Sequence, residues 1–195
     1  MTADRYYGTK SREYEKTRKK QLKWRFEKAI MLKVLKRLGD KVENVIDAPV
    51  GTGILLDLYK APVRGYDISQ DMLDLAKAKG TDATLKQWDI INKPIYAKAD
   101  LVVCIRFLNL VDWKDATKAL INLLAASKKY ILFTMRTVPH GFKGKMNVGR
   151  VYLHKDTDLK RLLADKGFEI VERFRHHDAV PGNYDLILCK RTDSE

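Results

Sequence analysis

The chain is poor in cysteine and histidine. Among its 195 residues there are two cysteines, Cys104 and Cys189, and four histidines. Both cysteines lie in apolar, strand-like segments, which indicates two buried thiols in a reducing compartment and not a disulfide framework. The cysteines and histidines lack the spacing of metal ligands, so we expect no metal site. The cysteine usage favours a cytoplasmic protein.

Long apolar segments are also missing. No run of apolar residues approaches the ~20 residues of a membrane-spanning helix. The first ten residues lack the apolar core of a secretory signal peptide. With 45% hydrophobic and 32% charged residues, the composition is typical of a globular protein with one sizeable core. We therefore expect no membrane partner.

Acidic residues are in the minority. The formal net charge is +13, and residues 1–37 carry +9 of it. A basic segment favours contact with a polyanion such as nucleic acid, or with acidic small molecules. The same excess is common on the solvated surfaces of proteins that bind neither. Charge alone therefore does not choose between these partners.

What the chain does contain is an alternation of short apolar segments with helical stretches. In the first helical stretch, 21–38, Leu22, Phe26, Ile30 and Val34 recur every four residues, which predicts one face packed on the domain. Strand-like segments follow at 43–48, 63–67, 83–88, 100–105 and 129–135, and helical stretches near 53–59, 70–79 and 112–126. This alternation predicts βαβ units and a parallel sheet with helices on both faces.

The end of the chain has a different pattern. After a helical stretch at about 156–166, the apolar segments 167–175 and 184–190 follow each other with only a short loop between them. Two strands connected so closely form an antiparallel pair. We therefore expect an α/β fold with a seven-stranded, mostly parallel sheet in the order 3-2-1-4-5-7-6, in which strand seven is antiparallel.

The segment VIDAPVGTG, at 45–53, reads as a buried strand that continues into a glycine turn. Ligands of open parallel sheets bind at the carboxyl ends of the strands. Gly51 and Gly53 permit a ligand to approach the backbone, and a helix beginning here favours a negative group. Asp67 ends the second strand, where a carboxylate suits both hydroxyls of a ribose. Asp89 ends the third strand and could accept a hydrogen bond from an adenine amino group.

Two other nucleotide-binding classes do not fit this turn. A dinucleotide-binding loop has a third glycine where this chain has Leu56, and it belongs to a fold with a second mononucleotide half instead of a terminal hairpin. A phosphate-binding P-loop continues with Gly-Lys-Ser/Thr, which does not follow here. The turn therefore predicts a different nucleoside ligand.

Four segments in order carry a family resemblance: DAPVGTG at 47–53, GYDISQDMLDLAKAK at 65–79, WDI at 88–90 and DLVVCIRFLNLV at 100–111. They resemble the four motifs of class I, Rossmann-like S-adenosylmethionine-dependent methyltransferases, and the terminal hairpin is similar to that family's reversed seventh strand. The resemblance covers about residues 20–191. It implies an enzyme that uses S-adenosyl-L-methionine (SAM) and forms S-adenosylhomocysteine (SAH).

The resemblance also implies roles for the residues of the first two motifs. Asp47 would orient the loop and lie near the methionine amino group, and Asp67 would bind the ribose. Pro49 departs from the pattern, because proline has neither the positive φ nor the N–H of the usual glycine. Gly51 and Gly53 must then make the close approach.

Residues further along the sequence are expected to contact the adenine and the sulfonium of SAM. The resemblance implies that Ile68 and Met72 pack on the adenine, that Asp89 and the backbone of Ile90 bind its edge, and that Cys104 and Arg106 lie near the sulfonium. Asp67 and Asp89 could instead be strand-end caps, and Met72 a core residue. The implied cofactor-binding set is Tyr14, Arg18, Trp24, Asp47, Ala48, Pro49, Gly51, Thr52, Gly53, Asp67, Ile68, Met72, Trp88, Asp89, Ile90, Cys104 and Arg106.

Methyl transfer depends chiefly on alignment, and on a general base where the acceptor must lose a proton. His140 follows strand five and His177 follows strand six, so both could face the acceptor, although loop histidines are often surface residues. We take His140, His177 and Arg106 as candidate catalytic residues. The residues expected around the acceptor are Arg106, Phe107, Arg136, His140, Arg150 and His177.

The acceptor class is narrowed by what the fourth motif lacks. Its CIRF stretch is not the Asn/Asp-Pro-Pro-Tyr/Phe of exocyclic-amine methyltransferases, and Cys104 is not followed by the proline typical of cytosine C5-methyltransferases. A compact domain favours a small-molecule acceptor, and the basic side chains suggest a carboxylate or phosphate on it. RNA methylation through the basic N-terminal segment is the alternative, and a non-catalytic SAM-binding protein is a third. We expect a monomer or a small homo-oligomer.

We divide the chain into a basic lid segment with its helix, 1–38, and one compact methyltransferase domain, 39–195. Aromatic residues interleave with basic ones in 5–28, a pattern that could bind single-stranded RNA or cover a cofactor. Because one face of the helix is predicted to pack on the domain, we favour the lid. Tyr14, Arg18 and Trp24 are then expected nearest the ligand.

Overall fold

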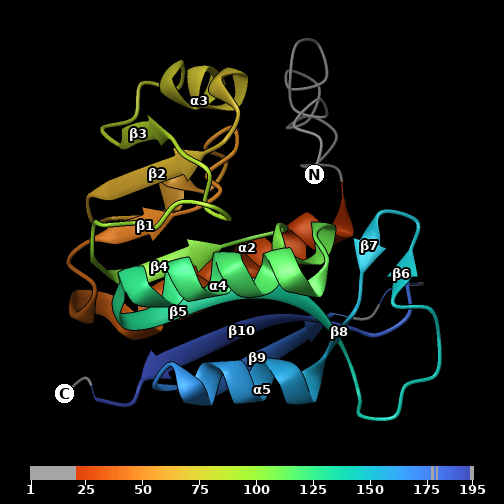
Figure 1. Ribbon diagram of the computed structural model, residues 1–195. Helices are drawn as coiled ribbons and strands as arrows, with labels where there is room; N and C mark the ends of the chain where they lie inside the picture. Colours follow the sequence, from red (N-terminus) through yellow and green to blue (C-terminus); the bar gives the residue numbers. More distant parts are fainter. Residues whose placement is uncertain (1–20, 177, 179, 194–195) are drawn as a thin grey trace.

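The central sheet of the computed structural model, which describes residues 21–176, 178 and 180–193, has the predicted order (Figure 1). The strands lie in the order β3 (Thr84–Gln87), β2 (Val63–Asp67), β1 (Val45–Asp47), β4 (Ala99–Cys104), β5 (Ser127–Val138), β10 (Asn183–Arg191) and β9 (Phe168–His176). β10 is antiparallel to both neighbours, whereas the other pairs on this path are parallel. The predicted α/β fold with strand order 3-2-1-4-5-7-6 is confirmed.

Helices cover both faces of the sheet, as predicted. α4 (Trp113–Ala126) and α5 (Asp156–Asp165) pack on one face, and α2 (Leu22–Leu38) and α3 (Gln70–Lys77) on the other (Figure 1). Every residue of the central strands β1 and β4 is buried, because both faces of these strands are covered. The carboxyl ends of these strands therefore stand between two apolar layers.

The helix boundaries follow from ordinary capping chemistry. Ser69 begins α3, where its hydroxyl accepts a hydrogen bond from the Met72 N–H at 3.4 Å. Asp112 begins α4 in the same way, accepting from the Asp115 N–H at 2.9 Å. α2 ends at Gly39, which has a φ of 50° and is followed by the short η2 turn (Gly39–Lys41).

The helix predicted at 53–59 is wrong. Only a three-residue 3₁₀ turn, η3 (Leu56–Leu58), forms there. Ile54, Leu55 and Leu56 are all buried, and a surface helix cannot direct three consecutive side chains into one core because each successive residue rotates by about 100°. No helix N-terminus therefore stands behind Gly51 and Gly53.

Three short strands were not predicted. β6 (Asn147–Val148) and β7 (Val151–Tyr152) form a separate hairpin beyond the end of β5. β8 (His154–Lys155) pairs in parallel with the last residues of β5. A further 3₁₀ turn, η4 (Leu108–Leu110), follows β4. These pieces all lie near the carboxyl ends of β4 and β5, and they shape that side of the edge.

The buried face of α2 differs from the predicted one. Leu22 is 74% exposed, whereas Val34 is buried. The buried positions are Trp24, Glu27, Met31, Val34 and Leu38. A strict four-residue spacing drifts by about 40° per step around a helix of 3.6 residues per turn, so it leaves the core within three steps. Spacings that alternate between three and four residues keep the side chains on the buried face of the helix.

The described part of the chain has neither a membrane-spanning helix nor a cluster of metal ligands. Within residues 21–176, 178 and 180–193, no helix is both long and apolar enough to cross a membrane. In the same residues, no group of three or more His, Cys, Asp or Glu side chains could hold a metal ion. Cys104 and Cys189 are both free and buried, as their apolar surroundings predicted.

The packing of α2 can be tested with two adjacent residues. Met31→Ala removes a fully buried side chain, and we expect the free energy of unfolding to fall by about 2–5 kcal/mol. Leu32→Ala, at a side chain that is 47% exposed, should change it by about 0.5 kcal/mol or less. Urea unfolding monitored by circular dichroism measures both. Equal small losses would contradict the packing of α2 on the sheet.

Candidate functional site

The loops after β1, β2 and β4 meet at one edge of the sheet, because these strands are parallel neighbours. Backbone hydrogen bonds hold the first loop between the other two strands. The Ala48 N–H donates to the Val103 carbonyl at 2.9 Å, and the Val50 N–H donates to the Tyr66 carbonyl at 2.8 Å. The glycine turn is therefore attached to the strands on both of its sides.

The two glycines of this turn have different reasons for being glycine. Both have positive φ, 56° for Gly51 and 69° for Gly53. A Cβ on Gly53 would lie 2.7 Å from Leu56 Cδ1 and 3.0 Å from Ala76 Cβ, so the packing of the turn leaves no space for it. A Cβ on Gly51 would meet nothing within 4 Å. Gly51 therefore faces open space into which a ligand can come.

The remaining residues of the first motif line the base of the turn. Asp47 is buried and accepts a hydrogen bond from the Tyr59 hydroxyl at 3.1 Å. Ala48 is fully buried, and the peptide bond between Ala48 and Pro49 is cis. Thr52 is buried, and its hydroxyl has no hydrogen-bond partner among the described residues.

Asp67 joins the first loop to the second. One carboxylate oxygen accepts the Gly51 N–H at 2.9 Å, and the other accepts the Ser69 N–H at 2.9 Å. Burial raises the pKa of Asp67 above its ordinary value, and the hydrogen bonds from Ser69 and Gly51 oppose that rise. Asp67 is thus a strand-end cap in this structure. A carboxylate can accept about four hydrogen bonds, so capping leaves capacity for a ribose.

The residues predicted around the adenine divide into exposed and buried ones. Ile68 is 45% exposed at the edge, as a platform for a flat ring would be. Met72 and Ile90 are buried. Asp89 accepts the Ile91 and Asn92 N–H groups and the Asn92 side-chain amide at 2.8–3.2 Å. Asp89 therefore caps its own turn.

Trp88 lies beside two lysines and an aromatic ring. The Nζ atoms of Lys86 and Lys93 stand 4.4 Å and 5.5 Å from the centre of the Trp88 ring, and the Tyr66 ring is 6.5 Å away. The Trp88 Nε1 is buried and has no hydrogen-bond partner among the residues that the structure describes. These contacts fix the indole next to the loop that follows β3.

The end of β4 places two predicted residues differently. Cys104 is fully buried, and burial, together with the charge of Asp47, raises the pKa of its thiol well above the ordinary value. The thiol is therefore a neutral core group. Arg106 has a φ of 58°, the one positive φ of a non-glycine residue in the described segments, and its N–H donates to the Thr134 hydroxyl at 2.5 Å. Such conformations cost about 1–3 kcal/mol and cluster at functional sites.

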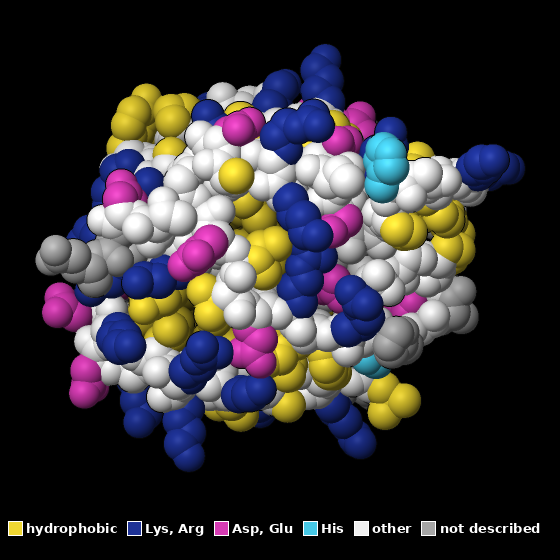
Figure 2. Space-filling model, turned by 90° about the horizontal axis from the view of Figure 1, so that it is seen from below, with side chains coloured by type: hydrophobic (Ala, Val, Ile, Leu, Met, Phe, Trp, Pro, Cys, Tyr) yellow, Lys and Arg dark blue, Asp and Glu magenta, His cyan; other side chains and the backbone are white. Residues whose placement is uncertain are grey.

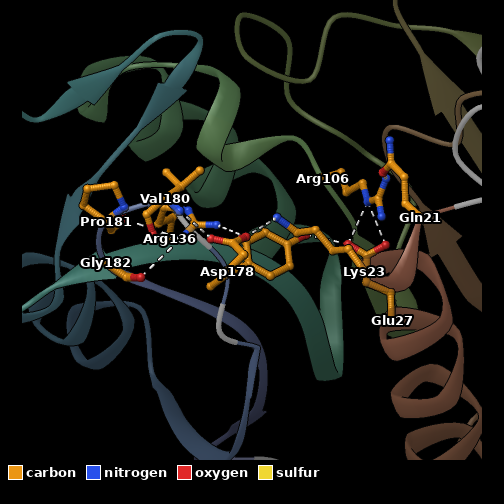
Figure 3. A network of polar contacts seen from close by, with 10 residues as sticks. Gln21, Lys23, Glu27, Arg106, Arg136, Asp178, Val180, Pro181 and Gly182 are labelled. Atoms are coloured by element: carbon orange, nitrogen blue, oxygen red, sulfur yellow. Dashed lines mark hydrogen bonds and ion pairs between the residues drawn. The ribbon is translucent and has the colours of Figure 1, made fainter.

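The side chain of Arg106 belongs to a buried network under the first turns of α2 (Figure 3). The Arg106 Nε donates to both carboxylate oxygens of Glu27, at 2.8 and 2.7 Å, and its Nη1 donates to the Gln21 side chain at 2.8 Å. The Tyr184 hydroxyl donates to the same Glu27 carboxylate at 2.5 Å. Burial, followed by the charge of Glu27, raises the pKa of Tyr184 well above its ordinary value, so the phenol keeps its proton.

Arg136 forms the other end of this network (Figure 3). Its guanidinium pairs with Asp178 at 2.5 Å and donates to the carbonyls of Val180, Pro181 and Gly182 at 2.9–3.4 Å. Arg106 and Arg136 are therefore occupied within the protein. Neither presents an uncommitted guanidinium to an acceptor, as the basic composition had suggested.

Lys23 stands between the two arginines. Its Nζ lies 3.2 Å from the centre of the Tyr184 ring and 3.4 Å from an Asp178 oxygen. Burial, followed by the charge of Arg136, lowers the pKa of Lys23 to about 8. The network thus contains three cationic side chains and two carboxylates.

The histidines have unequal surroundings. His140 is exposed in the turn after β5. His176 packs its ring against Phe26, with ring centres 5.0 Å apart. His154 is buried, and its Nε2 is hydrogen-bonded to the Leu108 carbonyl at 2.8 Å. His177 lies outside the described residues. The catalytic roles of His140 and His177 stay predictions.

The predicted lid residues are only partly described. Tyr14 and Arg18 lie outside the described residues. Trp24 is buried on α2, in the apolar cluster that includes Val34 and Leu186. The proposed division of the chain at residue 38 stays a prediction.

Sequence reasoning missed Glu27 and Tyr184. Glu27 is the one acidic residue between Leu22 and Leu38, and it lies in the stripe formed by Trp24, Met31 and Val34. A single carboxylate within such a stripe is the signal of a buried ion pair, since an unpaired charge is expensive to bury. The four-residue spacing concealed that signal by assigning the wrong face.

The comparisons with known proteins agree with this geometry. Residues 46–131 match a family described as a methyltransferase domain. Magnesium-protoporphyrin O-methyltransferase from Synechocystis is 27% identical over 146 residues, which are 65% of this chain. The chain matches 63% of that relative's length, just under two thirds.

Solved structures share the fold over most of the chain. Magnesium protoporphyrin IX methyltransferase from Synechocystis PCC 6803 with bound SAH has a TM-score of 0.76 at 18% identity, covering 96% of this chain and 97% of that one. A DhpI–SAM–HEP complex has a TM-score of 0.68 at 19% identity, covering 95% and 94%. At these identities the likeness shows the fold.

The glycine turn offers a matched test. Gly53 and Gly80 have the same φ of 69°, but a Cβ on Gly80 would meet nothing within 4 Å. Gly80→Ala should lower the free energy of unfolding by about 1–2 kcal/mol through backbone strain alone. Gly53→Ala should lower it by about 2–5 kcal/mol, because the methyl group also overlaps Leu56 and Ala76. Equal losses in urea unfolding would contradict the close packing at Gly53.

The buried amine of Lys23 predicts a pH dependence of stability. Between pH 8 and 10.5, the folded protein has released the Lys23 proton, whereas the unfolded chain still binds it. Unfolding then takes up a proton at Lys23, so the contribution of Lys23 to the free energy of unfolding rises with pH across this window. The buried thiols of Cys104 and Cys189 have raised pKa values and contribute a fall over the same window. Lys23→Gln loses this contribution, so its stability relative to the unaltered protein should decrease from pH 8 to pH 10, whereas Lys28→Gln, at an exposed position of α2, should follow the unaltered protein. Urea unfolding at pH 7, 8, 9 and 10 measures the difference. Parallel profiles for all three proteins would contradict the lowered pKa.

Proposed function

Because the chain contains a class I, Rossmann-like SAM-dependent methyltransferase domain, we propose that it transfers the methyl group of SAM to a small molecule that carries an anionic group. The cofactor lies in this proposal across the carboxyl ends of β1, β2 and β4. The free, buried thiols of Cys104 and Cys189 suit a reducing compartment, and we propose the cytoplasm.

The proposed cofactor site is supported by the arrangement of three residues at the edge of the sheet. Gly51 faces open space, Asp67 is held by the backbone amides of two loops, and Ile68 exposes an apolar side chain beside them. A ribose needs an acceptor for its hydroxyls, an adenine needs an apolar surface, and an amino-acid chain needs an accessible backbone. The residues present fit all three needs.

The chemistry asks little of the protein beyond placement. A bound sulfonium supplies an electrophilic methyl group and a good leaving group, so the chain contributes alignment and the exclusion of water. Arg106, at the end of β4, is held in its left-handed conformation by Thr134 and Glu27. His140 and His177 are the proposed bases for an acceptor that must release a proton.

A small acceptor is supported by the relative whose name gives magnesium-protoporphyrin as its substrate. An anionic group on the acceptor is supported by the charge of the segment beyond β5. The sequence has no acidic residue between Asp115 and Asp156. The exposed side chains His140, Lys143, Lys145 and Arg150 lie on this stretch. They replace Arg106 and Arg136 as the proposed contacts of an acceptor carboxylate or phosphate.

RNA is the alternative acceptor, through the basic N-terminal segment. Residues 1–20 of that segment lie outside the described residues. On the face seen in Figure 2, Lys and Arg side chains are interspersed with Asp and Glu. Nucleic-acid surfaces gather one sign of charge into a patch or stripe, so this face does not favour RNA.

The proposed function predicts a measurable cofactor affinity that depends on Asp67. Asp67→Ala should weaken SAM binding by about 1–3 kcal/mol, the scale for stranding hydrogen-bonded polar groups. Asp74→Ala, at an exposed position of α3, is the control and should bind as the unaltered protein does. Isothermal titration calorimetry measures all three, and labelled SAM then tests transfer to magnesium protoporphyrin IX, to small carboxylates and phosphates, and to RNA. Label in RNA alone would replace the small-molecule proposal, and no SAM binding at all would remove it.

A further inference from the structure

Glu27 is a fully buried carboxylate with a charged partner from another part of the fold. Its side chain is 0% exposed, and both of its oxygens accept from the Arg106 Nε. Tyr184 donates a further hydrogen bond to it from β10. The first turns of α2 are thus connected to the residue that follows β4.

Arg106 stands at the cofactor edge of the sheet. β4 pairs in parallel with β1, so the residues after Cys104 lie beside the glycine turn that follows Asp47. The Thr134 hydroxyl and the Glu27 carboxylate hold the backbone and the side chain of Arg106 respectively. The residue that carries this guanidinium therefore follows β4 at the edge where the proposed function puts a sulfonium, and its side chain extends from there to Glu27.

Two like charges at a partly buried edge repel each other. SAM carries a permanent positive charge on its sulfur, whereas the sulfur of SAH is neutral, and the rest of the two molecules is the same apart from the methyl group. The surrounding network contains the cations Lys23, Arg106 and Arg136 and the carboxylates Glu27 and Asp178. Among the described residues of this network, removal of the charge of Glu27 would leave three cations facing one carboxylate.

We propose that Glu27 is a selectivity residue that neutralises Arg106 and thereby raises the affinity of the site for the sulfonium of SAM relative to its affinity for the thioether of SAH. This inference rests on the proposed function, because it needs SAM and SAH to bind at this edge. Its consequence is relief of product inhibition: the charge of Glu27 raises the affinity for the substrate relative to the product. Glu27 is a positioning residue in this sense, since it acts through Arg106.

Holding α2 on the sheet is the competing role for Glu27. Breaking a buried ion pair destabilises a fold, whereas replacing both partners is often neutral. A structural role changes the affinity for SAM and SAH by the same factor, because both ligands share the fold they bind to. An electrostatic role changes the ratio of the two affinities. The ratio therefore separates the two roles.

The experiment measures dissociation constants of SAM and SAH, each alone, with the full-length protein by calorimetry. Glu27→Gln should weaken SAM binding by about tenfold and SAH binding by about twofold or less, as a lost countercharge at a partly buried site implies. Arg106→Gln should shift the ratio the other way, toward SAM. The double variant Glu27→Gln/Arg106→Gln should return near the original ratio, because both charges are gone.

Glu172→Gln is the matched control. Glu172 pairs with Lys33 and Arg37 on the outer side of α2, at 3.2 and 2.7 Å. The substitution removes the same formal charge from the contacts of the same helix. We expect it to leave the ratio of SAM to SAH affinity unchanged, because these pairs are exposed to water and share no residue with the network of Glu27 and Arg106.

The outcomes distinguish a failure of this inference from a failure of the proposed function. Equal weakening of SAM and SAH in Glu27→Gln, with unaltered protein binding both, overturns the inference and leaves the proposed function standing. No binding of either ligand by the unaltered protein overturns both. If Glu27→Gln does not fold by circular dichroism, Arg106→Gln decides, and an unchanged ratio in that variant overturns the inference.

Discussion

The carboxylate of Asp67 is the contact on which the geometry of the site depends. It lies at the end of β2, buried, and the N–H groups of Gly51 and Ser69 converge on its two oxygens. Because Ser69 also caps α3, one side chain fixes the glycine turn, the second loop and the start of a helix relative to one another. A buried carboxylate is costly without such partners, and the backbone amides reduce that cost. These contacts form without a ligand, and the hydrogen bond from Gly51 to Asp67 fixes the position of the glycine turn beside the open space at Gly51.

A second constraint comes from α2, whose buried stripe includes a charge. Four of its five buried residues are apolar and bind the helix to the sheet; the fifth is Glu27. An apolar residue in place of a buried ion pair is often as stabilising, so stability alone gives no reason to keep Glu27 and Arg106. The pair lies at the carboxyl edge, and the apolar contacts of Met31 and Val34 lie further along α2. The helix thus packs through one part of its length and reaches the site through another.

The sequence predicts the sheet order well, because the alternation of strands and helices is a local pattern that a parallel α/β fold follows. The same fold brings the strand-end motifs to one edge, and the binding roles of their residues stay predictions. The helix at 53–59 could not be predicted correctly, since the sequence of the apolar run Ile54–Leu56 does not say whether all three side chains are buried, and their joint burial is what excludes a surface helix. The partners of Arg106 and Arg136 were also out of reach. Glu27 lies 79 positions from Arg106, and Asp178 lies 42 positions from Arg136. A count of basic residues made both arginines look available to an acceptor, and only the three-dimensional contacts show that they are occupied.

The lowered pKa of Lys23 belongs to a buried network in which the described cations outnumber the carboxylates. Three cations and two carboxylates share the space under α2, and the amine of Lys23 is the group whose pKa falls, to about 8. Burial is the largest cause of this fall and the charge of Arg136 the next. Arginine cannot release a proton in this range, so the lysine is the cation of the network that can become neutral. An anionic group that bound beside the network would oppose this and favour the charged amine. By linkage, the protonated form of Lys23 would then bind that anion more tightly than the neutral form. The charge balance that couples the sulfonium of SAM to Glu27 thus also couples the protonation of Lys23 to any anion beside the network, whereas the anionic group of the acceptor is proposed to contact the exposed cations beyond β5.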